Sequence, residues 1–197
     1  MFSSFFKTFY YLITILTIMV ILISCIFIPI FINSNLELQI NQGEIVISQY
    51  GFAWPIPGYT TISSYYGKRI SPTAGASSFH KGLDIGAPEG SVLIASVDGQ
   101  ITYTGFLGGG GYTITLSKDN MKITYCHVSP NYLVKVGDNV IRGQIIGQVG
   151  PKYVYGVIGN NYKDEQGRPT NGATTGCHLH FGIRIDGEYV NPLEFFE

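Results

Sequence analysis

A stretch of 24 residues without a charge, Phe9 to Ile32, constrains this chain more than any other feature. Its side chains are apolar apart from four: Thr14, Thr17, Ser24 and Pro29. As a helix that rises about 1.5 Å per residue it would be roughly 36 Å long, enough to cross a hydrocarbon core of about 30 Å. A cleavable signal peptide has a shorter apolar core, of about 7–15 residues, followed by a small-residue cleavage site that is absent here. The sequence therefore predicts an uncleaved transmembrane anchor over residues 9–32.

Charges on either side of this stretch predict its orientation. Lys7 and the amino terminus precede it, whereas Glu37 and Glu44 follow it. Because basic residues favour the cytoplasmic side, residues 1–8 are expected in the cytoplasm and the chain beyond residue 32 outside it. The prediction is a single-pass protein of the cell membrane with an extracytoplasmic domain.

A second interpretation of the same stretch concerns Cys25. The sequence from Leu22 to Cys25 resembles the bacterial lipobox, in which the Cys is lipidated and becomes the new amino terminus. The alternative is an incidental Cys in a membrane helix, which the apolar side chains up to Ile32 favour. In both cases the domain that follows is tethered to a membrane and lies outside the cytoplasm.

The composition changes abruptly after residue 32, because all 25 glycines lie beyond it. The 165 residues that remain fit one domain of the usual roughly 100–200 residues. Without Lys7 they carry 11 basic and 13 acidic residues, a net charge of −2, which argues against a nucleic-acid-binding surface. Residues 33–50 are predicted to form a stalk, with Glu44 to Ile47 a candidate first strand, and residues 51–197 the domain.

Short runs of β-branched and aromatic residues recur through this domain, separated by turn signals such as Asp98-Gly99 and Asp186-Gly187. No stretch beyond residue 32 keeps an apolar period of 3.6 residues over the roughly 10–12 positions that a helix needs. The pattern predicts an all-β fold, a compact antiparallel sandwich or barrel-like domain. The predicted strands are Ser91–Val97, Gln100–Phe106, Tyr112–Ser117, Lys122–His127, Tyr132–Val136, Gln144–Val149 and His178–Ile185.

One segment, residues 151–175, breaks this rhythm. Its 25 residues are mostly Gly, Asn, Tyr and charged residues without a clear strand. Loops beyond roughly 12–15 residues without secondary structure are unusual. Two interpretations stay open: a lid or binding loop beside a functional site, or a tolerated surface insertion.

The four histidines, at positions 80, 127, 178 and 180, carry the strongest functional signal. Side chains alternate between the two faces of a strand, so His178 and His180 should share one face while Leu179 packs on the other. His80 and Asp84 are four residues apart, a spacing that places both side chains on one side of the chain. Gly82 between them favours an extended or looped backbone over a helix.

Two His and one Asp are suitable zinc ligands and leave a fourth tetrahedral position for water, as in catalytic zinc sites. One carboxylate leaves the centre a net charge near +1, enough Lewis acidity to bring the pKa of its water towards about 7. Two histidines then remain, His127 and one of His178 and His180. Imidazoles can transfer protons and stabilise an oxyanion near neutral pH. His127 ends a strand run, so alternation places it opposite Cys126 and facing the same groove.

The segments His80-x-x-x-Asp84, Tyr125-Cys126-His127 and Gly176 to Phe181 together resemble the lysostaphin-like (LytM-type) zinc endopeptidases, which cut peptidoglycan peptides. Supporting matches extend over residues 54–193; they are Trp54 to Gly58, Ile62 to Ser64, Gly67 to Arg69, Gly82 to Ile85, Ala87 to Gly90, Asp98-Gly99, Gly137 to Val140, Gly143 to Gly147 and Val190 to Leu193. The resemblance implies that His80, Asp84 and His180 bind one zinc ion. It implies that His127 and His178 assist the metal-bound water and the oxyanion. It also implies a compact antiparallel β domain whose groove holds the metal.

The chain departs from the family pattern in two loops. The family usually joins Gly150 to Gly176 by a short loop, so the 25 residues between them could wall the groove and alter what fits. Residues 106–112, with four consecutive glycines, form a second unusual wall. Neither segment contains a member of the ligand set, so these departures concern specificity more than activity.

Cys126 and Cys177 each precede a motif histidine, so alternation predicts that both point away from the metal face. We expect them to be small buried apolar side chains, as free cysteines commonly are. The alternative is a disulfide between neighbouring strands, which requires Cα atoms within roughly 7 Å. A role as zinc ligand is disfavoured.

The sequence as a whole predicts a membrane-anchored zinc metalloendopeptidase of the bacterial envelope that hydrolyses amide bonds in peptidoglycan stem or cross-bridge peptides. Its partners would be the peptidoglycan peptide and the membrane, without nucleic acid. The alternative is a non-catalytic envelope scaffold or wall-binding module that retains the peptidase fold. Such a protein is expected to have lost a ligand or a catalytic histidine, and this chain has lost neither. The sequence specifies neither the bond cleaved nor the oligomeric state.

Overall fold

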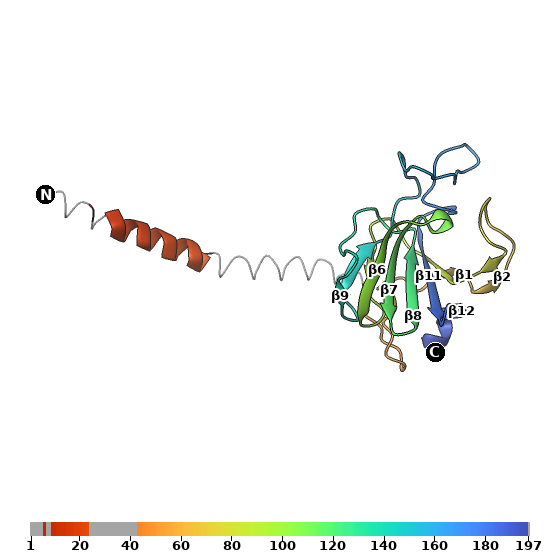
Figure 1. The fold of residues 1–197 in the computed structure, drawn as a ribbon, viewed down its shortest axis with the longest axis horizontal. Helices are drawn as coiled ribbons and strands as arrows, with labels where there is room; N and C mark the ends of the chain where they lie inside the picture. The colour runs from red at the N-terminus through yellow and green to blue at the C-terminus, as the bar shows by residue number, and fades with distance from the viewer. Residues whose placement is uncertain (1–5, 7–8, 24–42, 197) are drawn as a thin grey trace. The chain divides into compact units, whose positions relative to one another are not determined.

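In a computed structural model of the protein, the residues described are 6, 9–23 and 43–196 (Figure 1). The chain divides into two compact units, Met1–Asn41 and Gln42–Glu197. In the first unit, residue 6 and residues 9–23 are helical. Within the described part of the chain, no helix is both long enough and apolar enough to cross a membrane.

The predicted anchor over residues 9–32 is therefore not found among the described residues. Helix is present up to Ile23, and residues 24–32 of the predicted span, with Cys25, lie outside the described residues. Residues 33–42 of the predicted stalk lie outside them as well. The anchor, the lipobox and the stalk stay predictions. The candidate strand from Glu44 to Ile47 is wrong: Ile47 forms a single bridge to Ala53, and its side chain is half exposed.

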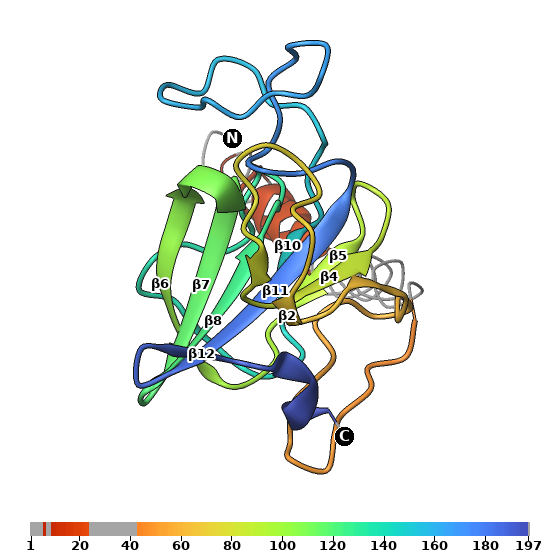
Figure 2. The same ribbon diagram turned by 90° about the vertical axis from the view of Figure 1, so that its right-hand side faces the viewer.

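An antiparallel sheet of eight strands forms the framework of the second unit (Figures 1 and 2). Seven strands follow the spatial order β1 (Ile62–Ser64), β4 (Leu83–Gly86), β11 (His178–Ile185), β8 (Met121–Cys126), β7 (Tyr112–Lys118), β6 (Gly99–Phe106) and β9 (Asn139–Val140). The eighth strand, β12 (Glu188–Val190), pairs with β11. Two small sheets pair β2 (Gly67–Lys68) with β3 (Phe79–His80) and β5 (Val92–Ile94) with β10 (Ile145–Gln148). Two 3-10 helices are η1 (Gly108–Gly110) and η2 (Pro192–Phe195).

The predicted antiparallel β domain is confirmed, and the described residues beyond 42 contain no α-helix. Six of the seven predicted runs contain a strand. The run Tyr132–Val136 does not: Val134 is buried and Leu133 exposed, as alternation requires, but no strand of the described chain pairs with it. Strands β1, β2, β3, β4, β9 and β12 were not predicted, because two to four residues are too few to display a period.

The two faces of the large sheet differ in polarity, which β11 makes clear. Leu179, Phe181 and Ile183 are buried in one core cluster together with residues of β5 and β10. Tyr125 on neighbouring β8 joins them, and its hydroxyl donates to Ser96 Oγ at 3.1 Å and accepts from the Ser96 N–H at 2.9 Å. The buried phenol is therefore satisfied. The alternate residues of β11 face the other way, and the candidate site lies on that side.

Candidate metal centre

One row of paired residues crosses the polar face of the large sheet. Asp84 on β4 pairs with His180 on β11, His180 pairs with Cys126 on β8, and Cys126 pairs with Thr113 on β7. Directly paired residues of antiparallel strands project from the same face. Strand pairing alone therefore places the Asp84 carboxylate beside the His180 imidazole, although the two residues are 96 positions apart.

His80 reaches the same place from β3, where its side chain is almost completely buried. The chain between His80 and Asp84 passes very close to β11. A Cβ atom on Gly82 would lie 2.4 Å from the carbonyl oxygen of Phe181, so only glycine permits this approach. The predicted extended or looped backbone is confirmed, because His80 ends β3, Leu83 begins β4 and no helix lies between them. The close approach to β11 gives the steric reason for glycine at position 82.

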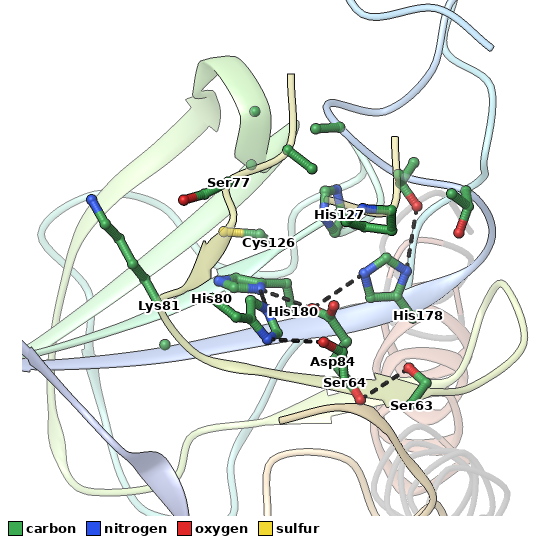
Figure 3. Close-up of a pocket in the computed structure, with 18 of the residues that line it drawn as sticks. Ser63, Ser64, Ser77, His80, Lys81, Asp84, Cys126, His127, His178 and His180 are labelled. Carbon is green, nitrogen blue, oxygen red and sulfur yellow. Dashed lines mark hydrogen bonds and ion pairs between the residues drawn. The ribbon is translucent and has the colours of Figure 1, made fainter. Parts of the chain in front are cut away.

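Three potential ligand atoms face one another (Figure 3). His80 Nε2 lies 3.0 Å from Asp84 Oδ1 and 2.9 Å from His180 Nδ1, and His180 Nδ1 lies 2.9 Å from Asp84 Oδ1. Ligands about 2.0–2.1 Å from a tetrahedral ion are about 3.3 Å apart, so a small outward shift of the side chains fits a metal ion. In the described part of the chain, this is the group of residues that could hold a metal.

Hydrogen bonds behind the ligands fix their orientation. His80 Nδ1 lies 2.9 Å from the carbonyl oxygen of Tyr65. A carbonyl oxygen only accepts, so Nδ1 carries the proton and Nε2 turns its lone pair to the centre. Arg69 donates to Asp84 Oδ2 at 2.9 Å and to Ser64 Oγ at 2.6 Å. Arg69 thereby holds the carboxylate by Oδ2, and Oδ1 faces the position of the metal.

The protonation states of the group also fit a metal. Burial alone would raise the pKa of Asp84, but the adjacent imidazoles of His178, His180 and His80 lower this pKa well below its usual range. Burial lowers the pKa of His180, against the opposing effect of Asp84. Metal ligation requires an ionised carboxylate and neutral imidazoles, and both shifts favour these forms.

His127 reaches the pocket by a break in strand geometry. Strand β8 ends at Cys126, and His127 has a φ of 58°, in the left-handed region that few residues other than glycine adopt. Because Cys126 shares the face of His180, alternation would have turned His127 towards the core. The left-handed backbone returns it to the polar side, so the predicted location is correct but the predicted reason, alternation, is wrong.

Two features define the state of the His127 ring. Its Nδ1 lies 2.6 Å from the carbonyl oxygen of Asn171, so Nδ1 donates and Nε2 has a free lone pair. Burial, followed by the charges of His178 and His180, lowers the pKa of His127 to about 3. The ring is therefore neutral at neutral pH.

His178 is held in the same manner. Its Nδ1 lies 2.9 Å from the carbonyl oxygen of Gly176 and 3.3 Å from Thr174 Oγ1, whereas Nε2 lies 3.5 Å from Asp84 Oδ1. The ring centroids of His178 and His127 are 4.7 Å apart. The two imidazoles therefore lie together at one side of the ligand group (Figure 3), each oriented by a backbone carbonyl.

A pocket of about 790 Å³ surrounds these residues. Its borders include residues of the β2–β3 connection, the η1 glycines and residues 173–178. The predicted loop 151–175 lies beyond the end of the sheet at which β11 begins (Figure 2). It contains only isolated bridges, Tyr153 to Thr170 and Lys163 to Pro169, and no strand, as predicted. Of the two interpretations left open for this loop, a role beside the site is favoured, because its last residues border the pocket.

Asn171 anchors the end of this loop. It is fully buried; its side chain accepts from the Tyr112 N–H at 2.8 Å and donates to the Val128 carbonyl at 3.1 Å. The same residue offers its own carbonyl to His127. Asn171 therefore links the loop, the two strand ends and one candidate catalytic histidine.

Tyr162, near the middle of the loop, touches two other borders of the pocket. A Cβ atom on Gly75 would lie 2.7 Å from Tyr162 Cε1, and one on Gly109 would lie 3.4 Å from the Tyr162 hydroxyl. The ring therefore packs against the tip of the β2–β3 connection and against η1. Three loops that border the pocket meet at this one side chain.

The prediction that Cys126 points away from the metal face is wrong. Cys126 pairs with His180 and borders the pocket instead of facing away, because the left-handed His127 does not continue the alternation of β8. Cys177 also borders the pocket, and both thiols are free, so the alternative of a disulfide is not formed. Burial raises the pKa of the Cys126 thiol to about 12. A protonated thiol is a poor zinc ligand.

Several residues that orient the site were missed from the sequence. Arg69 lies in a motif of the family resemblance, but nothing in its spacing indicated a bond to Asp84. Tyr65, Asn171 and Gly176 act through backbone carbonyl oxygens, which no side-chain pattern reveals. Only the structure identifies them.

Comparisons with known proteins agree with this geometry. Residues 78–192 match the family model described as Peptidase family M23. The chain is 33% identical over 153 residues to the DD-carboxypeptidase/endopeptidase Mpg of Neisseria meningitidis serogroup B, covering 77% of this chain and 31% of that protein. It is 29% identical over 131 residues to the murein hydrolase activator NlpD of Escherichia coli, covering 66% and 29%. The chain thus spans about a third of the length of these curated relatives.

Among solved structures, the catalytic domain of the antimicrobial peptidase lysostaphin from Staphylococcus simulans superposes with a TM-score of 0.55 at 29% identity. The superposition covers 70% of this chain and 92% of that domain. The likeness therefore extends over nearly the whole of that catalytic domain.

Proposed function

Because this chain belongs to peptidase family M23, we propose that it is a zinc endopeptidase that hydrolyses amide bonds in peptidoglycan stem or cross-bridge peptides. The predicted lysostaphin-like family is confirmed. One observation carries the proposal. Three ligand atoms lie within 3.0 Å of one another, while two neighbouring imidazoles are oriented with Nδ1 on backbone carbonyls.

We assign the metal to His80 Nε2, His180 Nδ1 and Asp84 Oδ1. Zinc bound there would polarise an amide carbonyl and lower the pKa of a coordinated water. Arg69 keeps Asp84 Oδ2 away from the centre through its ion pair at 2.9 Å. The carboxylate therefore contributes one oxygen, and room is left for water and substrate.

We assign proton transfer to His127 and His178. In the neutral ring each Nε2 accepts a hydrogen bond, and once protonated it donates to a developing oxyanion or to the leaving amine. Because burial lowers the pKa of His127 to about 3, this ring is neutral and its Nε2 is available to accept a hydrogen bond. Positioned acid–base groups of this kind contribute about 10²–10⁴-fold to a rate.

The substrate class rests on the names of the relatives. A DD-carboxypeptidase/endopeptidase and an antimicrobial peptidase are among the proteins that this chain resembles. Both names describe peptidases, and the name of a third relative, the murein hydrolase activator NlpD, refers to the wall polymer murein. We therefore propose a peptide of the bacterial wall as substrate, without assigning the bond.

We further propose that residues 9–32 anchor the protein in the cell membrane, or that Cys25 is lipidated, with residues 51–197 outside the cytoplasm. The uncharged run and the charges around it support this. A stalk over residues 33–50 would extend at most about 60 Å, so the substrate would be wall close to the membrane. Equal activity in cells of a variant with a shortened stalk would contradict this limit on reach.

A second candidate function follows from the similarity to the murein hydrolase activator NlpD. A protein of this kind would use the same fold to stimulate another hydrolase without cutting. It corresponds to the scaffold predicted as the alternative from the sequence. The complete set of three ligands and two further histidines favours the peptidase.

The test is to measure zinc per chain of the purified full-length protein and the release of peptide fragments from purified peptidoglycan, with and without a chelator. One zinc and chelator-sensitive release, with fragments identified by mass spectrometry, are expected. Bound zinc without release from several wall chemistries would favour the activator. In that case, adding a separate purified wall hydrolase should reveal stimulation.

A further inference from the structure

One end of the pocket carries positive charge that the proposed reaction does not use. The polar face of β11 presents, in order, His178, His180, Gly182 and Arg184. At about 3.3 Å per residue, the Arg184 backbone is roughly 13 Å from that of His180. Arg184 therefore lies on the side of the ligand group away from His178.

Two lysines accompany Arg184 there, and we call Lys81, Lys122 and Arg184 the cationic end. Lys81 borders the pocket, and in Figure 3 its side chain extends away from the histidines. The Lys81 Nζ and the Arg184 Cζ lie 5.0 and 5.1 Å from the centroid of the Tyr189 ring. Lys122 pairs directly with Arg184 across β8 and β11. One aromatic ring thus gathers two of the three cations.

The charges of the cationic end are not compensated within the described part of the protein. None of the three cations has an ion pair there. Arg184 Nε is buried without a hydrogen-bond partner, which costs stability. Like charges directly opposite each other, as in the Lys122–Arg184 pair, destabilise an antiparallel sheet.

Among the described residues that border the pocket, no carboxylate is placed to compete for these cations. Asp84 is the acidic residue among the described residues that border it, and its two oxygens are engaged by Arg69 and by the histidines. Glu188 pairs with Ile185 and so projects from the other face of the sheet. An anion from outside would meet no repulsion at this end.

The pocket follows β11 from the ligand group to the cationic end. Gly182 lies between His180 and Arg184, and Thr124 is its partner on β8. A Cβ atom on Gly182 would lie 3.1 Å from the carbonyl oxygen of Lys81. The Lys81 backbone therefore passes close over Gly182, which is buried. Lys81, Gly182 and Arg184 all border the pocket, so the pocket extends from the ligand group to the cationic end.

We propose that the cationic end binds a free carboxylate of the peptide substrate, within about four residues of the amide that is cleaved. The proposal rests on the proposed function and specifies its substrate: a peptide with a free acid rather than a carboxamide on this side of the cut. Arg184 has the planar donor pair that binds carboxylates in a bidentate manner. Lys81 supplies a second positive charge beside the Tyr189 ring.

The test uses two cross-linked stem peptides that are identical except that one has its free carboxylates converted to carboxamides. The full-length wild-type protein, Arg184→Gln and the control Lys135→Gln are compared by kcat/KM on both. Lys135 is an exposed cation outside the pocket. We expect the wild type and the control to prefer the carboxylate peptide by about tenfold or more, and Arg184→Gln to lose this preference. Zinc content should be equal in all three.

A binding measurement separates failure of this inference from failure of the proposed function. Isothermal titration of both peptides into the metal-free proteins needs no turnover. If the wild type cleaves both peptides equally, the carboxylate site is refuted while the peptidase stands. If the wild type cleaves neither, the peptidase fails and the titration decides: tighter binding of the carboxylate peptide that Arg184→Gln abolishes supports the site, and equal binding overturns it.

Discussion

His80, Asp84 and His180 owe their positions to strands, whereas His127 and His178 owe their orientation to a loop. Register places Asp84 beside His180, and the Tyr65 carbonyl and Arg69 complete the group. The other two rings are fixed by carbonyl oxygens of Asn171 and Gly176. The comparison teaches that metal affinity and turnover are encoded in different parts of the chain, so that each should be separable from the other by mutation.

The largest effect is expected from Asp84→Asn. The variant removes the only anionic ligand and leaves the Arg69 guanidinium without its ion pair. Zinc should fall from about one per chain to near zero, and peptide release should fall below detection. Metal analysis after dialysis measures the first quantity. If Asp84→Asn kept a full zinc ion, the ligand group would have to be reassigned.

His178→Ala tests the same division at a residue that we assign to proton transfer. We expect zinc to be retained and kcat to fall by about 10²–10⁴-fold, the usual contribution of a positioned acid–base group. Metal analysis and peptide release on the same preparation give both numbers. Loss of the zinc in this variant would show that His178 belongs with the ligands, and the division between the two groups would fail.

Asn171→Ala tests the loop itself. The change leaves the Tyr112 N–H and the Val128 carbonyl without their partners in a buried place. We expect the free energy of unfolding to fall by about 2–6 kcal/mol, since each of the two groups costs about 1–3 kcal/mol. Turnover should fall by about tenfold as His127 loses its orientation, and denaturant unfolding measures the stability.

Asn161→Ala, an exposed position in the same loop, is the matched control for Asn171→Ala. It should leave stability, zinc and turnover near the wild-type values. If Asn171→Ala lost more of its zinc than of its turnover, the division between residues positioned by strands and residues oriented by the loop would fail.

The smallest effect is expected from Asp164→Asn. Asp164 binds Arg168 and Tyr153 within the outer part of the loop, away from the pocket. We expect zinc and kcat/KM to stay within about twofold of wild type, because Asp164 does not border the pocket. Limited proteolysis should cut the loop faster. A large loss of activity would mean that the outer loop contacts substrate.

Much of this arrangement was predictable from local sequence, and the remainder was not for physical reasons. Alternation correctly placed His178 and His180 on one face of a strand and Leu179 in the core. It failed at Cys126 and His127, because the left-handed backbone of His127 ends the alternation of β8. No side-chain pattern in the sequence predicts this conformation. The short strands β2 and β3, of two residues each, exist only because tertiary contacts bring them together.

The residue types of the site were predictable from the sequence, but the groups that orient these residues were not. Metal-binding chemistry restricts ligands to a few side chains, so His80, Asp84 and the His178–His180 pair were conspicuous. Tyr65, Asn171 and Gly176 act through backbone carbonyl groups, which every residue of any chain has. Only the location of these three groups in space distinguishes them. The cationic end was missed for a related reason: Lys81, Lys122 and Arg184 are distant in sequence and meet through the pairing of β8 with β11 and packing around Tyr189.

The central place of β11 has a consequence for how the protein is made. β11 lies between β4 and β8, and His180 follows His80 by 100 positions. During synthesis, the strands of the large sheet that precede β11 form two separate groups, β1 with β4 and β8 with β7, β6 and β9. Only the late insertion of β11 joins them. A nascent chain that has not reached residue 180 has no complete ligand set, so the proposed hydrolytic activity would begin only after the domain has closed.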